Sequence, residues 1–305
     1  MLDSSSLSLI KFREAAMEKV FMICACTSIM FILLICLFLF VNGLPAIFEV
    51  GLSNFLLGME WAPLRSYPAT PQFGILPMVT GSIIFTLGAI VIGVPIGIFT
   101  AVFFAYMCPI RLYTFIKPVV NLLAGIPSVV YGFFGMMVII PIIRPIAMYY
   151  TMHLPGAATG ASVLTVSILL GIMILPTIIA LSEAALRSVP RNYYEGSLAL
   201  GASHTRSVFF VMVPAAKSGI LASIILGIGR AVGETMAVVM IAGNQARMPI
   251  HLLRGARSMT ANIVIEMGYA SGLHRDALIA TAVVLFIFIL LINLAFNLLT
   301  RKGKQ

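Results

Sequence analysis

The sequence predicts an all-α polytopic membrane protein, on the basis of its composition, its long apolar runs and the placement of its charges. Of its 305 residues, 61% are hydrophobic and only 10% are charged, whereas soluble domains carry about 25% charged residues. Several apolar runs are long enough to cross a bilayer as helices. Lysines and arginines gather at the ends of these runs, as the positive-inside rule requires.

Six membrane spans are expected within a transmembrane domain of residues 20–300. Two of them contain helix breakers: Gly93-Val94-Pro95-Ile96-Gly97 should bend or break the second, and Gly125-Ile126-Pro127 the third. Such breaks are tolerated where the freed backbone groups face protein or a water-filled cavity. The expected spans are residues 20–41, 74–106, 118–143, 160–181, 219–242 and 277–299.

The charge distribution predicts the orientation of these spans. Six spans place both termini on one side, and most basic residues fall on that side, which is therefore expected to be the cytoplasm. Loops around residues 43–73, 144–159 and 243–276 then face outward. Residues 1–19 form a cytoplasmic segment, poorly ordered at its polar start, and 301–305 form a tail.

Several function classes are disfavoured by what the sequence contains. The net charge of +9 lies at the ends of apolar runs, which indicates membrane topology and lipid contact rather than nucleic-acid binding. The four cysteines show no metal or redox spacing, and no cleavable signal peptide is apparent. The sequence has no phosphate-cradling G-x-x-x-x-G-K-[ST] motif and no catalytic constellation, so any ATP-derived energy must come from a partner.

Arg230 and Glu234 lie in the middle of the fifth expected span. Arg230 follows Gly219 by about 16 Å of helix, roughly half the hydrocarbon thickness. At four residues apart, the two charges should share one helix face. Intramembrane charges usually mark a pathway, and a guanidinium suits phosphate oxygens. We therefore expect an anion site with Glu234 balancing Arg230; the alternative is a buried ion pair that fixes helix register.

Further polar residues are weaker candidates for contact with a transported anion. Ser128 and Tyr131 follow the break at Pro127, where they either line the path or cap the broken helix. Arg247, Arg254 and Arg257 make the last outward loop basic. That loop attracts phosphate, docks an acidic surface of a binding protein, or is simply solvated.

Residues 186–214 predict a helix–turn–helix on the cytoplasmic surface. Pro190 suits the start of a helix, Gly201 suits its end or a sharp turn, and a second short helix should run to Pro214. On these features alone the segment is either an ordinary amphipathic linker or a docking element. Its arginines Arg187, Arg191 and Arg206 would set topology or touch a partner.

The same segment resembles the "EAA" signature of ABC-importer permeases. Glu195, Gly201 six residues later, and Val213-Pro214 match that signature, while Gly196 and Ser197 replace its two alanines. The resemblance implies that the helix pair docks into a cleft on an ATP-binding subunit. The residues implied in this coupling are Glu195, Gly196, Leu200, Gly201, Ala202 and Pro214.

Further motifs resemble the PstC-type permeases of phosphate ABC importers, over about residues 60–300. These are Phe73–Pro77, Ala124–Gly132, Gly229–Val238 and Ser258–Ala261. The resemblance implies a bacterial inner-membrane permease that carries phosphate and binds no cofactor, with ATP and Mg²⁺ on the partner ATPase. It also implies three partners: a homologous PstA-like permease, a dimeric PstB-like ATPase and an external PstS-like phosphate-binding protein.

Three alternatives stand beside this expectation. The first is a permease for another oxyanion, such as molybdate, sulfate or phosphonate. The second is a membrane-embedded enzyme acting on lipid phosphates, which would need a nucleophile or acid–base pair near Arg230. The third is a gated anion channel with no ATPase.

Overall fold

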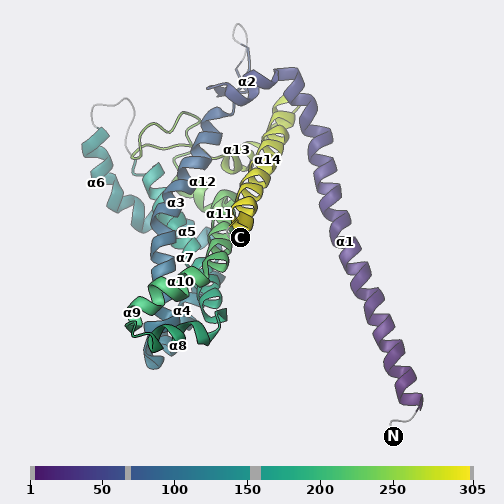
Figure 1. Ribbon diagram of the computed structural model, residues 1–305. Coiled ribbons are helices and arrows are strands. Elements are labelled where there is room, and N and C mark those ends of the chain that lie inside the picture. The colour runs from purple at the N-terminus through teal and green to yellow at the C-terminus, as the bar shows by residue number, and fades with distance from the viewer. Residues whose placement is uncertain (1–3, 66–69, 152–158, 303–305) are drawn as a thin grey trace.

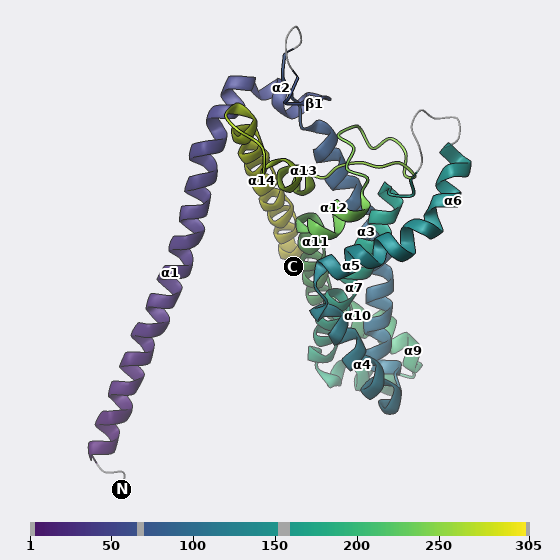
Figure 2. The ribbon, with the colours of Figure 1, turned by 180° about the vertical axis from the view of Figure 1, so that it is seen from behind.

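The computed structural model describes residues 4–65, 70–151 and 159–302, and its architecture is helical (Figure 1). The chain starts with the long helix α1 (Ser4–Val50) and ends with α14 (Leu273–Lys302). These two helices pack at the end of the molecule that also holds α2 (Leu52–Leu57), and α1 then leans away from the rest (Figures 1 and 2). Helix α1 includes the N-terminal segment from Ser4 onward, and the expectation that its polar start is poorly ordered stays a prediction; residues 1–3 and 303–305 lie outside the described residues.

The core is built on close packing of α3 (Leu76–Val102) against α7 (Val163–Ser188). Glycines permit the approach: a Cβ on Gly93 would lie 2.7 Å from the carbonyl oxygen of Gly171. The helix α3 continues through Pro95, so of the expected bend or break at this point the break is wrong. A π-helical turn, η1 (Phe103–Met107), instead follows the helix. Buried Leu169, Leu170 and Met173 form much of the apolar centre.

The third expected span is broken where predicted but lies further along the chain. Helix α4 (Ile110–Gly125) ends before Ile126 and Pro127, which are both extended, and α5 (Ser128–Phe134) begins directly afterwards. The π turn η2 (Gly135–Ile139) and α6 (Ile140–Thr151) then complete an apolar helix. The candidate span is therefore Ser128–Tyr150 rather than 118–143, and the outward loop expected from residue 144 starts after α6, in part outside the described residues.

The fifth expected span, 219–242, is not one helix. Helix α11 (Lys217–Gly233) stops before Glu234, whose backbone is extended, and the short α12 (Met236–Ile241) follows. In the described part of the chain, five helices are long and apolar enough to span a membrane. A sixth is counted if α11 and residues 204–215, bent by 69° from it, form one span.

Opposite ends of the molecule carry different small elements. At one end, strands β1 (Trp61–Ala62) and β2 (Gln72–Phe73) pair antiparallel beside α13 (Met259–Glu266). The expected helix–turn–helix lies at the other end, with α4 and η1 (Figure 1). Its elements are α8 (Arg191–Ala199), α9 (His204–Ser207), the π turn η3 (Val208–Met212) and α10 (Val213–Ala215).

Candidate functional site

Arg230 and Glu234 do not form the pair that their spacing predicts. Because α11 ends at Gly233, Glu234 leaves the helix face that carries Arg230. The Glu234 carboxylate instead accepts a hydrogen bond from the backbone amide of Ala237, at 3.1 Å, and so caps α12. Among the described residues, none of the ion pairs includes Arg230 or Glu234. The predicted helix-face pairing is therefore wrong, because the glycine-rich end of α11 lets the chain turn away.

The half-buried Arg230 lies against a residue that the sequence did not single out. Its Nη1 donates to the Thr177 hydroxyl on α7, at 3.5 Å, which is a long hydrogen bond. Tyr131 on α5 is near enough to Arg230 for an electrostatic interaction with it. Helices α5, α7 and α11 therefore converge on one guanidinium. Thr177 lies next to Pro176 inside the apolar helix α7. In the sequence, this hydroxyl beside a proline in an apolar run was the only feature that could have marked it as a site residue.

Tyr131 serves as a cap at the helix break. Its hydroxyl donates to the carbonyl oxygen of Leu123, at 2.8 Å, in the last turn of α4. This bond satisfies one of the carbonyls left free where that helix ends. Ser128 is the first residue of α5 and is half-buried. The capping alternative thus describes Tyr131, and its hydroxyl ties α4 to α5 across Pro127.

The helix–turn–helix closes through a glycine turn of the expected kind. Gly201 has φ +85°. Its amide bonds the Leu198 carbonyl at 2.9 Å, and the Ala202 amide bonds the Ser197 carbonyl at 3.1 Å. This is the Schellman pattern that ends a helix at a left-handed residue. The turn that follows α8 is therefore set by Gly201, as predicted.

This coupling segment presents an exposed face. Helix α8 buries none of its residues, Leu200 is 91% exposed, and Glu195 and Gly196 are also exposed. The second helix of the segment runs through α9, η3 and α10 to Ala215, one residue beyond the expected Pro214. Contiguous exposed apolar residues beside polar ones are typical of a protein-binding surface, which favours docking over a plain linker.

Of the three arginines in the outward loop, Arg257 has a structural role. Its Nη1 lies 2.6 Å from Glu266 and 2.9 Å from the side-chain oxygen of Asn262. The other oxygen of Glu266 accepts from the indole of Trp61 and contacts His274. The expectation that Arg257 attracts phosphate or docks a partner is wrong, because its charge is satisfied inside this buried cluster.

The other two arginines of the loop face a common pocket. Arg247 and Arg254 line a cavity of about 230 Å³ with His251. Burial, and then the nearby charge of Arg254, lower the pKa of Arg247 below its ordinary value. The two guanidiniums therefore concentrate positive charge on this loop.

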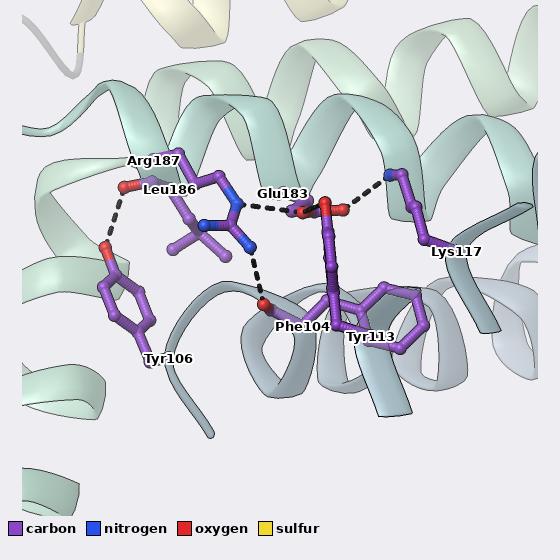
Figure 3. Close-up of polar contacts among 7 residues, drawn as sticks. All are labelled: Phe104, Tyr106, Tyr113, Lys117, Glu183, Leu186 and Arg187. Atoms are coloured by element: carbon purple, nitrogen blue, oxygen red, sulfur yellow. Dashed lines mark hydrogen bonds and ion pairs between the residues drawn. The ribbon is translucent and has the colours of Figure 1, made fainter. Parts of the chain in front are cut away.

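A buried carboxylate that sequence reasoning missed lies near the coupling segment. Glu183 of α7 is 3% exposed and accepts from three side chains, as Figure 3 shows. The donors are Tyr113 Oη at 2.8 Å, Lys117 Nζ at 2.6 Å and Arg187 Nε at 2.9 Å. Arg187 was expected to set topology or contact a partner, but it also bonds the Phe104 carbonyl at 2.8 Å. In the sequence, the spacing of four residues between Glu183 and Arg187 could have predicted this ion pair on one helix face.

The fold is shared with a solved membrane transporter. It matches a chain of the MetNI methionine ABC transporter, in an inward facing conformation, with a TM-score of 0.53. The match covers 76% of this chain and 95% of that chain at 22% identity, which establishes the fold class alone. The family of binding-protein-dependent transport system inner membrane components matches residues 93–303. The chain belongs to this family.

Two relatives share most of the sequence. The probable ABC transporter permease protein YqgH of Bacillus subtilis is 36% identical over 88% of this chain and 86% of its own length. The phosphate transport system permease protein PstC of Mesorhizobium japonicum is 34% identical over 83% of this chain and 80% of its own. Family membership confirms a multi-pass transport subunit rather than an enzyme acting on lipids, and a transport system that depends on a binding protein.

Proposed function

We propose that this chain is a permease subunit of an ATP-driven importer of inorganic phosphate. The observation that carries the proposal is the half-buried guanidinium of Arg230, which has no carboxylate partner among the described residues. A guanidinium in a membrane-spanning helix is costly unless it faces protein or a water-filled path. Its planar donors match the oxygens of an oxyanion and stay charged at physiological pH. The likeness to PstC of Mesorhizobium japonicum supports phosphate as that oxyanion.

In this proposal Arg230 holds the anion briefly at the middle of the membrane. Thr177 orients the guanidinium from α7. Glu234 holds the neighbouring turn by capping α12, so it shapes the site without neutralising Arg230. Because a single guanidinium with one weak partner binds an anion less tightly than a closed cage, the anion can leave again.

The energy comes from other subunits. A PstB-like ATPase dimer binds ATP and Mg²⁺, and one copy docks onto the exposed coupling segment around Glu195 and Leu200. A PstA-like permease lies beside this chain, and a PstS-like protein delivers phosphate from outside. The chain resides in a bacterial inner membrane with both termini in the cytoplasm. The charge bias of the sequence and the coupling segment support this orientation.

Replacement of Arg230 tests the proposal directly. In proteoliposomes containing the whole transporter, Arg230→Gln is expected to reduce phosphate uptake about 100-fold or more, because one charged hydrogen-bonding group contributes about 1.5–3 kcal/mol and long-range attraction is lost as well. Arg230→Lys should recover only part of it, since the planar fork is absent. Arg275→Gln, at an exposed arginine in the first turn of α14, is the control. Normal uptake by Arg230→Gln would contradict the proposal.

The competing cargoes are other oxyanions. YqgH is named as a permease without a cargo, so molybdate, sulfate and phosphonate are tested in the same vesicles. We expect an excess of unlabelled phosphate to suppress labelled phosphate uptake, and sulfate or molybdate at the same concentration to leave it nearly unchanged. Stronger competition by any of these three would reassign the cargo while keeping the permease role.

A further inference from the structure

Four side chains join two helices next to the coupling segment, and they are called here the α4–α7 clasp: Tyr113 and Lys117 of α4, and Glu183 and Arg187 of α7. One carboxylate accepts from the other three (Figure 3). Its side chain is 4% exposed, against 21% for Lys117 and 49% for Arg187. The clasp therefore consists of a buried anion held between an inner and an outer cation.

Stability alone is a weak reason for such a cluster. Burying a charge costs several kcal/mol, and replacing a buried ion pair by apolar residues is often neutral or stabilising. Apolar packing already joins the same helices, since Val120 of α4 and Ile179 of α7 belong to one buried cluster. The clasp adds direction and fixed distance to that contact, because three hydrogen bonds meet at one carboxylate.

The clasp is in contact with the coupling segment through η1. Tyr194 of α8 stacks on Tyr106, with ring centroids 6.4 Å apart and an angle of 19° between the planes. The Tyr106 hydroxyl donates to the Leu186 carbonyl at 2.7 Å, and Arg187 bonds the carbonyl of Phe104. A displacement of α8 is thus passed to the end of α7 and to η1 through polar and aromatic contacts.

On its other side the clasp leads to the helix break near Arg230. Helix α4 carries Tyr113 and Lys117 at one end and Leu123 at the other. The Leu123 carbonyl is held by Tyr131 of α5, and α5 packs against α12, which Glu234 caps. A continuous series of contacts therefore connects the docking surface to the turn beside Arg230.

We propose that Glu183 is a positioning residue that transmits movement of the coupling segment through α4 to the break at Pro127. This inference rests on the proposed function, because it assumes that an ATPase moves the coupling segment. When the clasp is intact, α4 moves with α7 as one body and carries α5 with it. When the hydrogen bonds of the clasp are removed, α8 still moves together with the bound ATPase, but α4 and α5 no longer move with it.

The first experiment measures movement without using any cargo. The four native cysteines are replaced by alanine, and Ser128→Cys is introduced at the start of α5 in the whole transporter. Alkylation of that cysteine is compared without nucleotide and with ATP plus vanadate. We expect the nucleotide to change the alkylation rate about fivefold or more, as is typical of coupled sites, and Glu183→Gln to abolish the change while nucleotide binding persists. An unchanged nucleotide response in Glu183→Gln overturns the proposal.

The second experiment tests whether the clasp acts as a unit. Phosphate transported per ATP hydrolysed is measured for the pair Tyr113→Phe/Lys117→Met, which removes both donors of α4, for Glu183→Gln, and for the combination of all three changes. We expect similar losses in all three, because cutting either side removes the same link and effects within one network are not additive. If the losses multiply when the changes are combined, the clasp residues act independently, and the idea that they form one unit is contradicted. Lys217→Met, at an exposed lysine at the start of α11, is the control and should couple normally.

Two outcomes separate this inference from the proposed function. If the unaltered transporter shows a nucleotide-dependent alkylation that Glu183→Gln abolishes, but moves no phosphate, the cargo is wrong and the clasp stands. If it moves phosphate and Glu183→Gln keeps the full alkylation response, the cargo stands and the clasp fails. Should Glu183→Gln not assemble, the pair Tyr113→Phe/Lys117→Met gives the same test, because Glu183 then keeps Arg187 while both of its bonds to α4 are removed.

Discussion

At the residue scale, three positions have roles set by backbone conformation or by the partner that a charge finds: Gly201, Glu234 and Arg257. Gly201 sits at φ +85°, a region that costs residues with a side chain about 1–2 kcal/mol. Glu234 does not pair with Arg230 as expected, and its carboxylate caps α12 instead. Arg257 lies in the outward loop but its charge is taken up by Glu266. Local backbone geometry sets the roles of Gly201 and Glu234, whereas a carboxylate on α13 sets that of Arg257.

Replacing Gly201 should therefore weaken docking of the ATPase through strain alone. An added Cβ at Gly201 meets nothing within 4 Å, so steric clash plays no part. We expect Gly201→Ala to reduce co-purification of the ATP-binding subunit about fivefold or more, from about 1–2 kcal/mol of strain. Gly229→Ala is the matched control, since that site is equally open but helical and lies outside the coupling segment, and it should bind normally. Equal binding by both variants would show that the turn is not needed.

At the scale of the elements, glycine decides which helices pack and where they end. A Cβ on Gly88 would lie 2.1 Å from the hydroxyl oxygen of Ser167, and one on Gly97 would lie 2.7 Å from Ile178. These contacts set the short distance between α3 and α7. Helices in lipid associate mainly through such close approach of small residues.

A larger residue at this contact should separate the two helices. Gly93→Val places atoms against the Gly171 carbonyl and Ile174, both at 2.7 Å from the Cβ. Overpacking of this kind costs about 1–3 kcal/mol, which should lower the thermal unfolding midpoint of the detergent-purified protein by several degrees. Gly229→Ala, where nothing lies within 4 Å, should leave the midpoint unchanged. A midpoint for Gly93→Val equal to that of the unaltered protein would contradict this account of the packing.

At the scale of the whole molecule, polar clusters lie at both ends and apolar packing fills the middle. At one end the Glu183 carboxylate joins α4 to α7, and at the other Glu266 joins the β1 strand, α13 and α14 through Trp61, Arg257 and His274. Helix α1 touches the bundle mainly near the end that holds α2 and leaves a long apolar surface exposed along its length (Figure 2).

Removing the charge at Glu266 should destabilise the outer end. Breaking a buried ion pair from one side costs about 3–5 kcal/mol, so Glu266→Gln should lower the thermal midpoint more than any surface change. Glu60→Gln is the control, because the Glu60–Arg65 pair is exposed and such pairs contribute about 0–1 kcal/mol. The comparison is made by thermal unfolding of the purified protein. A similar midpoint for both variants would mean that Glu266 does not hold the outer elements together.

The sequence by itself determined the membrane class, the helix–turn–helix of residues 186–214, its Gly201 turn and the break at Pro127, because these follow from apolar length and from the backbone chemistry of glycine and proline. Tertiary structure decided that Pro95 stays within a helix, that α11 ends before Glu234, and that Glu183 and Thr177 find partners on other helices. Proline and glycine make a break in a helix possible, but whether the helix breaks depends on how neighbouring helices satisfy the freed backbone groups. A lone carboxylate in an apolar run likewise acquires its role only when folding brings Tyr113 and Lys117 to it.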